Sequence, residues 1–427
     1  LLSDVGEAVH LGSLGDVRER RGDTAGAMTA YARALEIDPA YAFGLRKLFD
    51  HHCGKGEFGR AKDILDTARP HFPQVENLSR LCLWHWRQRQ HAPARAIVLE
   101  MASLENAFGY SFNRIMDEIR LSHVRNECVL LKRDVAKAIQ TRQTRNSHAA
   151  AFYVSLTHFL GMIPAHEVMR EVALDDEGGE QAFVRLFSHL AERWEKKQGS
   201  EFGGLQAWWV GRQVARFIRE HREALRSRDE TWGMVGFTLH TMKRNREVIA
   251  WLSDWRERSE LEPYMLNNLF FSLQSEGNKD EAAAVLARGL ELPRHDDTTM
   301  RFHLYAALED LLAGREEQAR RHLEVVHKPE LSSFSLRVLD LVNALLWYQP
   351  GKPAKHFDEG ASAAVEGFKN CNEKSRLGQD YVTRACRHIA RHNRSWQPLL
   401  WLLFQRHSIL IGVVLAILLI IVSWLAS

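Results

Sequence analysis

Apolar positions recur along most of this chain at intervals of three and four residues, the spacing of one face of an α-helix. Residues 11–20 carry this pattern, Gly22 and Asp23 interrupt it, and residues 24–36 resume it before Pro39. Glycine and aspartate favour a turn, and a helix seldom continues into a proline. The pattern therefore predicts a helical hairpin, which is two short helices joined by a tight turn.

The same hairpin recurs one period later, since Ala27 is matched by Ala61 after 34 residues. We expect Gly15, Ala27 and Ala34 to let the two helices approach closely. Leu11, Leu14 and Tyr31 are expected to fill the space between them. The positions that recur are Leu11, Leu14, Gly15, Ala27, Tyr31, Ala34 and Pro39 in the first unit, and Leu45, Leu48, Phe49, Ala61, Leu65, Ala68 and Pro73 in the second.

These units closely resemble the tetratricopeptide repeat, although Leu11 stands where that family has its consensus tryptophan. A third unit around Ala94 is weaker and lacks the proline, and a further one is expected over residues 232–263. An unrelated bundle with accidental periodicity is the alternative. The pattern returns at Leu266, Leu269, Gly277, Ala282, Leu286 and Pro293, and again at Ala306, Ala307, Gly314, Ala319, Leu323 and Pro329.

No period is visible between residues 107 and 231, yet helical stripes such as Phe183, Leu186, Phe187 and Leu190 continue there. Either one continuous solenoid or two separate arrays fits this pattern. Trp208 and Trp209 are expected to pack inside the helical stack rather than to form an exposed partner site. The predicted fold is all-α, a TPR-like solenoid of hairpins plus one C-terminal transmembrane helix. Its expected segments are repeats at 1–106, a degenerate helical segment at 107–231, repeats at 232–330, a helical juxtamembrane region at 331–407 and a transmembrane helix at 408–427.

Residues 409–426 carry no charge and are almost entirely apolar, at a length near the minimum for crossing a bilayer. Trp401 and Trp424 suit the two membrane interfaces, and arginines gather on the N-terminal side of this segment. The predicted protein is single-pass and tail-anchored, with its large N-terminal domain in the cytoplasm. The arginines either contact anionic lipid headgroups or act only as a topology signal. They are Arg384, Arg387, Arg391, Arg394 and Arg406.

Composition adds few constraints. The net charge is +3, from 57 basic and 54 acidic residues, so no global field points to a nucleic acid. Five scattered cysteines favour a reducing compartment over a disulfide framework. The chain begins Leu-Leu-Ser-Asp without methionine, so either residues precede Leu1 or there is no secretory leader.

No signature of a catalytic site is recognisable, so we expect neither an enzyme nor a cofactor. The glycines of residues 53–59 lack the spacing of a phosphate-binding loop and predict a turn between helices. A zinc site is not expected, because the tight paired spacings of structural zinc ligands are missing. The histidines and cysteines that would form one are His51, His52, Cys53, Cys82 and His85.

Members of the family that this chain resembles bind peptides or partner helices on a concave surface lined by the first helix of each hairpin. The positions that match that groove are Asp16, Arg20, Arg46 and Asp50 in the first array, and Tyr264, Asn267, Phe271 and Gln274 in the second. Gly12 and Asp16 replace the lysine and asparagine with which the chaperone-binding members hold a carboxylate. We expect a membrane-anchored scaffold or adaptor that binds proteins or peptides. One alternative is a regulatory or assembly subunit of an enzyme complex, or the non-catalytic part of a longer enzyme chain. The second alternative is a self-associating membrane-organising protein.

Overall fold

A computed structural model describes residues 2–105, 109–122, 124–144, 147–174, 176–198, 203–258, 260–292, 296–348, 359–371 and 376–403. Every regular element in these residues is a helix, and none of them forms a strand, so the predicted all-α class is confirmed. The chain divides into two compact units, Leu1–Val235 and Gly236–Ser427. The predicted transmembrane helix at 408–427 lies outside the described residues.

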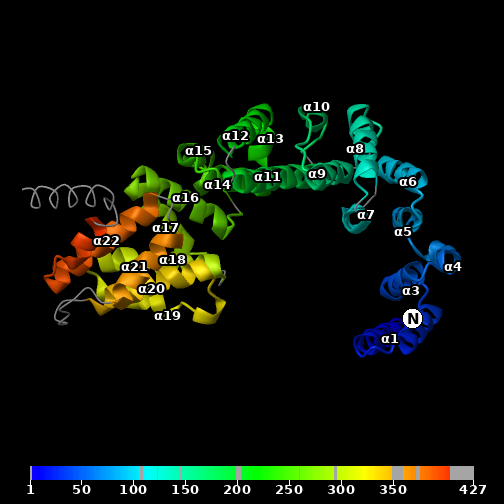
Figure 1. The fold of residues 1–427 in the computed structure, drawn as a ribbon, viewed down its shortest axis with the longest axis horizontal. Coiled ribbons are helices and arrows are strands. Elements are labelled where there is room, and N and C mark those ends of the chain that lie inside the picture. The colour runs from blue at the N-terminus through cyan, green and yellow to red at the C-terminus, as the bar shows by residue number, and fades with distance from the viewer. Residues whose placement is uncertain are drawn as a thin grey trace, which may run out of the picture. The chain divides into compact units, whose positions relative to one another are not determined.

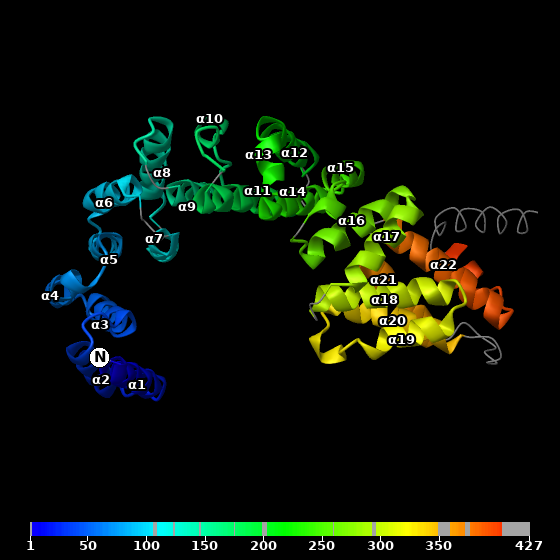
Figure 2. The ribbon, with the colours of Figure 1, turned by 180° about the vertical axis from the view of Figure 1, so that it is seen from behind.

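Unit 1 is a solenoid-like row of hairpins, with its first helices on the inner side and its second helices on the outer side (Figures 1 and 2). The first helices are α1 (Leu2–Arg20), α3 (Ala42–Gly54), α5 (Gln74–Arg87), α7 (Gly109–Ser122), α9 (His148–Phe159) and α11 (Glu177–Gln198). The second helices are α2 (Thr24–Ile37), α4 (Phe58–Ala68), α6 (His91–Ser103), α8 (Arg125–Gln140), α10 (His166–Met169) and α12 (Gly203–Glu220). The unit also contains η1 (Arg69–His71), α13 (Arg222–Ser227) and the start of α14 (Asp229–Thr241).

The first three hairpins turn through one residue with a left-handed backbone. Gly22 and Gly56 have φ of 84° and 74°, and Arg89 takes the same place in the third hairpin with φ of 60°. Glycine adopts this conformation without the steric cost, about 1 kcal/mol, that an L side chain incurs. The side chain of Asp23 accepts a hydrogen bond from the Gly26 N–H at 2.9 Å, which caps the start of α2. The turn predicted at residues 53–59 is present.

Close packing of the first hairpin depends on Gly15. A Cβ added there would lie 2.5 Å from the Tyr31 ring, so glycine alone lets that ring lie against α1. Ala27, Tyr31 and Ala34 are fully buried, as predicted. The prediction for Leu14 was wrong, because its side chain is 42% exposed. Successive helical residues point about 100° apart, so Gly15 cannot face α2 while Leu14 does so too.

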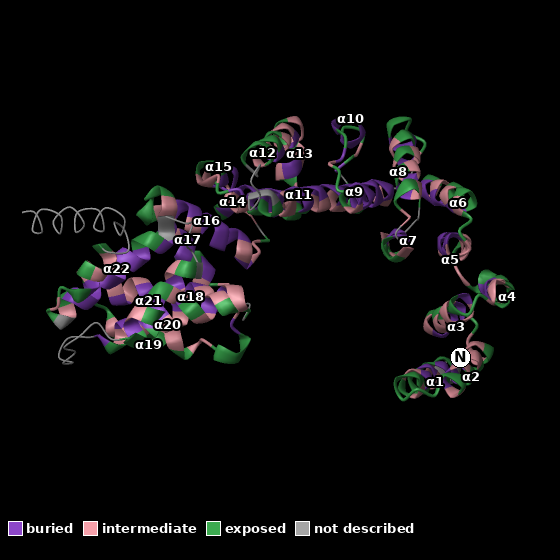
Figure 3. Ribbon diagram, in the orientation of Figure 1, coloured by how far each residue is buried: buried purple, intermediate pink, exposed green. Residues whose placement is uncertain are grey.

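The row of first helices continues through the middle segment. First helix packs on first helix from α5 to α7, α9 and α11, and the stripe predicted in α11 is fully buried. The helix α9 is buried almost throughout because α7, α8 and α11 all pack against it (Figure 3). The described residues between 109 and 198 are therefore part of the same compact unit as the first array.

The tryptophan pair of α12 corrects another prediction. Trp208 and Trp209 are 59% and 46% exposed rather than packed in the stack. The buried face of α12 is supplied by Val210, Val214 and Phe217, which share one side of the helix, and Trp208 lies on the opposite side. This leaves an exposed aromatic patch near the start of α12.

Unit 2 contains the hairpins predicted in the C-terminal half. Gly277 and Gly314 form their turns with φ of 81° and 79°, and Ala282 and Ala319 are fully buried at the helix contacts. Residues 397–403 are also helical. The elements of unit 2 that follow α14 are α15 (Asn245–Trp251), η2 (Trp255–Glu257), α16 (Pro263–Glu276), α17 (Lys279–Leu290), α18 (Asp297–Leu312), α19 (Glu316–Glu324), η3 (Lys328–Glu330), α20 (Ser333–Trp347), α21 (Glu359–Cys371) and α22 (Arg376–Asn393).

Candidate functional site

The groove residues predicted in the first array lie on α1 and α3, and three of the four, Asp16, Arg20 and Asp50, form ion pairs. Asp16 forms ion pairs with Arg20 at 2.6 Å and with Lys47 at 3.8 Å. Arg46 is exposed and lies over the Phe43 ring at 5.3 Å. These contacts join α1 to α3 and leave Arg46 without a carboxylate partner in the described part of the chain.

Asp50 belongs to a ladder of charges across three first helices. Its carboxylate accepts from Arg87 of α5 at 2.7 Å, and Arg87 also donates to Glu118 of α7 at 2.8 Å. Burial disfavours the charged guanidinium, but the hydrogen bond and charge of Glu118 outweigh it and raise the pKa of Arg87. Asp50 therefore helps to hold the inner face of unit 1 together.

The groove residues predicted in the second array are largely enclosed. Asn267 is buried, and Tyr264, Phe271 and Gln274 are half-buried. The Phe271 ring meets Tyr305 edge-on at 5.3 Å. Gln274 lines a hollow of about 350 Å³.

The helix α22 packs across α16, α18 and α20, the first helices of three successive hairpins. Tyr381 of α22 is fully buried, and its ring stacks on Tyr305 at 6.2 Å. Its hydroxyl donates to Glu309 at 2.6 Å. The surface predicted to hold a partner is therefore in contact with a helix of the same chain.

Arg384 of α22 strengthens this contact through two hydrogen bonds to Glu309, at 2.9 and 2.6 Å. Burial opposes ionisation of Glu309, but the bonds from Arg384 and Tyr381 outweigh it and hold the pKa of the carboxyl below its ordinary value. The structure gives Arg384 this contact within unit 2, whereas the sequence placed it among the membrane-interface residues.

Of the other residues predicted at the membrane interface, four lie in the described part of the chain and two do not. Arg387, Arg391 and Arg394 are exposed, with no ion-pair partner among the described residues, and Trp401 is half-buried. Exposed apolar side chains at Trp396, Leu400 and Leu403 share one helical face. Arg406 and Trp424 lie outside the described residues. Within the described ranges, no helix combines the length and apolar character needed to cross a membrane.

The inner face of unit 1 is hollowed where α7, α9 and α11 lie side by side. A cavity of about 430 Å³ is lined by residues of these helices, among them Asn113, Arg120, Ser155 and Arg185, and by Met234 of α14. The guanidinium of Arg185 donates to the Ser155 hydroxyl at 2.9 Å and to the Asn113 amide oxygen at 3.0 Å. Burial, and then repulsion from Arg120, lowers the pKa of Arg185. The partly buried guanidinium of Arg185 therefore has only neutral hydrogen-bond partners among the described residues.

A second hollow of about 540 Å³ shares Arg120, His158 and His189 with the first. The rings of His158 and His189 stack with centroids 4.0 Å apart. His189 is only 3% exposed, its Nε2 lies 2.9 Å from the Met162 carbonyl oxygen, and burial lowers its pKa to about 4. Glu192 lies 3.1 Å from His158. The two histidines and Glu192 place their ligand-type atoms within 4.8 Å of one another.

Sequence reasoning missed this cluster, because the middle segment shows no visible period. One signal was present in the sequence, because polar residues recur within each of these first helices at intervals of three or four residues. They are Asn113, Asp117 and Arg120 in α7, Ser155 and His158 in α9, and Arg185, Ser188, His189 and Glu192 in α11.

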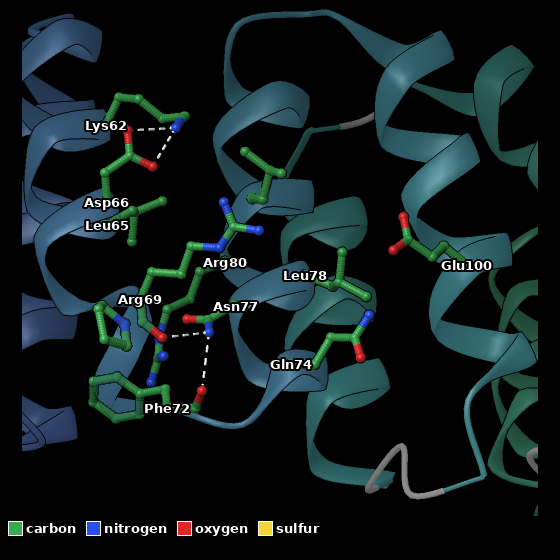
Figure 4. Close-up of a pocket in the computed structure, with 12 residues that line it drawn as sticks. Lys62, Leu65, Asp66, Arg69, Phe72, Gln74, Asn77, Leu78, Arg80 and Glu100 are labelled. Atoms are coloured by element: carbon green, nitrogen blue, oxygen red, sulfur yellow. Dashed lines mark hydrogen bonds and ion pairs between the residues drawn. The ribbon is translucent and has the colours of Figure 1, made fainter.

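A third hollow, of about 540 Å³, lies among α4, α5 and α6 (Figure 4). Arg80 is buried there, with its guanidinium carbon 3.8 Å from the centre of the Phe72 ring and Nη2 2.7 Å from Glu76. Asn77 donates to the carbonyl oxygens of Arg69 and Phe72 at 2.9 and 3.0 Å. These contacts close the turn between α4 and α5, and we assign them to folding.

Neither the models of known protein families nor the curated proteins include a match to this chain.

Proposed function

We propose that this protein is a membrane-anchored scaffold that binds a partner protein on the inner face of unit 1, where α7, α9 and α11 lie side by side. The observation that carries the proposal is the difference between the two inner faces. In unit 2, α22 packs across the first helices. In unit 1, two hollows that share Arg120, His158 and His189 carry charged side chains in their linings. Solenoids of stacked hairpins commonly bind extended segments on such a face.

The hairpins are proposed to be tetratricopeptide repeats. Small residues at the helix contacts support this assignment, as do glycine turns one period apart, at Gly22 and Gly56. The degenerate hairpins of the middle segment belong to the same array under this proposal, because their first helices pack in the same row.

The membrane anchor is proposed from residues 409–426, whose apolar run is long enough to span the hydrocarbon core. The exposed arginines 387, 391 and 394 precede it, followed by the apolar face of Trp396, Leu400 and Leu403. Cationic and then apolar side chains suit the order of headgroups and acyl chains. Because arginines are enriched on the cytoplasmic side of membrane spans, a cytoplasmic location is proposed for unit 1.

Proximity labelling in the native host tests this function. The full chain is compared with a chain ending at His407, and with Ser188→Trp, which fills the hollow without changing its charge. Thr67→Trp, at an exposed position on α4, is the matched control. We expect labelled cytosolic proteins at a membrane, lost with Ser188→Trp and kept with Thr67→Trp. Equal labelling by both tryptophan variants contradicts the groove, and unchanged membrane location of the shortened chain contradicts the anchor.

Self-association is a second candidate, favoured by the exposed patch of Leu205, Trp208 and Trp209 on α12. Large exposed apolar residues that lie together often mark a protein contact. The mass of the protein in detergent distinguishes this function, since Trp208→Ser with Trp209→Ser would reduce an oligomer to a monomer.

A further inference from the structure

The two hollows on the inner face of unit 1 carry an excess of positive charge that the whole chain does not show. Their linings contain five cationic side chains but two carboxylates, Asp117 and Glu192. Across all 427 residues, the net charge is only +3. The cations are Arg120, Arg125, Arg185, Arg193 and Lys196.

Three of these guanidinium groups have only neutral hydrogen-bond partners among the described residues. Arg185 donates to Ser155 and Asn113, as described above. Arg125 donates to the Leu160 carbonyl at 2.8 Å, and Arg193 donates to the Gly161 carbonyl. The Nε of Arg193 is buried with no hydrogen-bond partner in the described part of the chain. Arginine forms its strongest contacts with planar anions such as carboxylates, so these groups have capacity for an anionic ligand.

The carbonyls at the end of α9 explain only part of this arrangement. Arg125 and Arg193 donate to the carbonyls of the two residues that follow α9, which is a common structural role for arginine. Arg185 lies at the middle of α11 and faces neutral side chains instead. Arg120 is exposed, and among the described residues its guanidinium donates to Asp117 on its own helix at 3.1 Å. The excess of charge therefore extends beyond helix capping.

We propose that this face binds an acidic segment of a partner protein, with its carboxylates held by Arg120, Arg185 and Arg193. This inference rests on the partner-binding function proposed above and adds the chemistry of the partner. Packed helices are about 8–10 Å apart, so the distance from α7 to α11 is roughly 20 Å. An extended chain rises about 3.3 Å per residue, and roughly six residues would cover it. Asn113 and Ser188 supply hydrogen bonds for the backbone of such a segment.

A metal ion is the competing occupant, because His158, His189 and Glu192 are the residue types of a zinc site. Three features favour the anion. The ammonium of Lys196 already contacts Glu192, and Arg193 and Arg120 would repel a cation. The two imidazoles are stacked with only 23° between their planes, so their nitrogen lone pairs do not converge on one point.

Fluorescence anisotropy with the intact protein in neutral detergent tests the proposal. The probe is a labelled peptide in which glutamate alternates with serine, and the matched peptide has glutamine in place of glutamate. We expect only the acidic peptide to bind, with affinity that falls as salt is added. Arg185→Gln is expected to weaken binding roughly tenfold, since one charged hydrogen-bonded contact is lost. Arg185→Lys keeps the charge but loses the forked geometry and should give an intermediate loss.

Arg133→Gln is the matched control, because it removes an exposed charge from α8 on the outer row. Equal weakening by Arg133→Gln and Arg185→Gln would show nonspecific attraction and overturn the proposal, as would equal binding of the glutamine peptide. Arg120→Gln, at an exposed position, carries the test if Arg185→Gln does not fold. Calorimetry with zinc chloride tests the competing metal site. Tight binding of zinc that is lost in His189→Gln would overturn the proposal in favour of a metal site. If the acidic peptide does not bind but partner proteins are still labelled in cells, this inference is overturned while the proposed partner-binding function stands.

Discussion

Arg384 and Glu309, 75 residues apart in the sequence, form a forked ion pair whose nitrogen–oxygen distances are 2.9 and 2.6 Å. The pair joins α22 to α18 beside the buried Tyr381 of α22, whose hydroxyl donates to the same Glu309. A helix from the end of unit 2 is thereby fixed across the first helices of the hairpins that precede it. This contact places a helix of the same chain on the inner face of unit 2.

The first prediction concerns that ion pair. Arg384→Gln leaves Glu309 partly buried without its cation, so we expect unit 2 to lose about 2 kcal/mol of stability. Hydrogen exchange should quicken in residues 376–393 first. The control is Arg391→Gln, because Arg391 is exposed on the same helix and has no ion-pair partner among the described residues. Equal exchange in the two variants would show that the pair does not hold α22.

A second prediction compares two glycines of α1. Gly15→Ala places a Cβ 2.5 Å from the Tyr31 ring, and the resulting shift should cost about 1–3 kcal/mol. Gly6→Ala meets nothing within 4 Å and should stabilise the helix by about 0.5–1 kcal/mol. Urea denaturation of the two variants measures both effects. Destabilisation of similar size at the two positions would refute the close approach of Tyr31 to α1.

A third prediction tests the charge ladder of the first helices. Arg87→Gln removes the partner of both Asp50 and Glu118, so a loss of about 2 kcal/mol is expected from groups that are partly buried. Arg20→Gln breaks an exposed pair with Asp16 and should cost less than about 0.5 kcal/mol. Thermal melting distinguishes these outcomes. If Arg20→Gln proves as costly as Arg87→Gln, the ladder does not hold the inner face.

The fourth prediction concerns the stability of the fold at acidic pH. Burial lowers the pKa of His240 to about 4, from an ordinary value near 6.5. Between these values the unfolded chain binds a proton that the folded chain does not, so stability falls as the pH drops from about 6.5 to about 4. His240→Leu, which cannot be protonated, should reduce the slope of melting temperature against pH over this window. Replacement of the exposed His10 is the control, and an unchanged slope in His240→Leu would argue against a buried neutral ring.

Much of the local structure could be predicted from the sequence because it depends on nearby residues. The turns at Gly22 and Gly56 follow from glycine's freedom at positive φ, and the buried stripe of α11 follows from helical spacing. Arg89 has no such signal, because its left-handed backbone is imposed by the packing of the hairpin that it joins. The same limit applies to Leu14 and to Trp208, whose faces of the helix are turned away from the next element.

The sequence by itself determined that the chain is helical, that its hairpins recur, and that a long apolar segment follows them. Short-range spacing and residue type are sufficient for these properties. Only the tertiary structure decided that Asn113, Ser155 and Arg185 meet in one hollow, and that α22 lies across the first helices of unit 2. Residues far apart in the sequence make these contacts, and they come together because each helix must bury its apolar face against another.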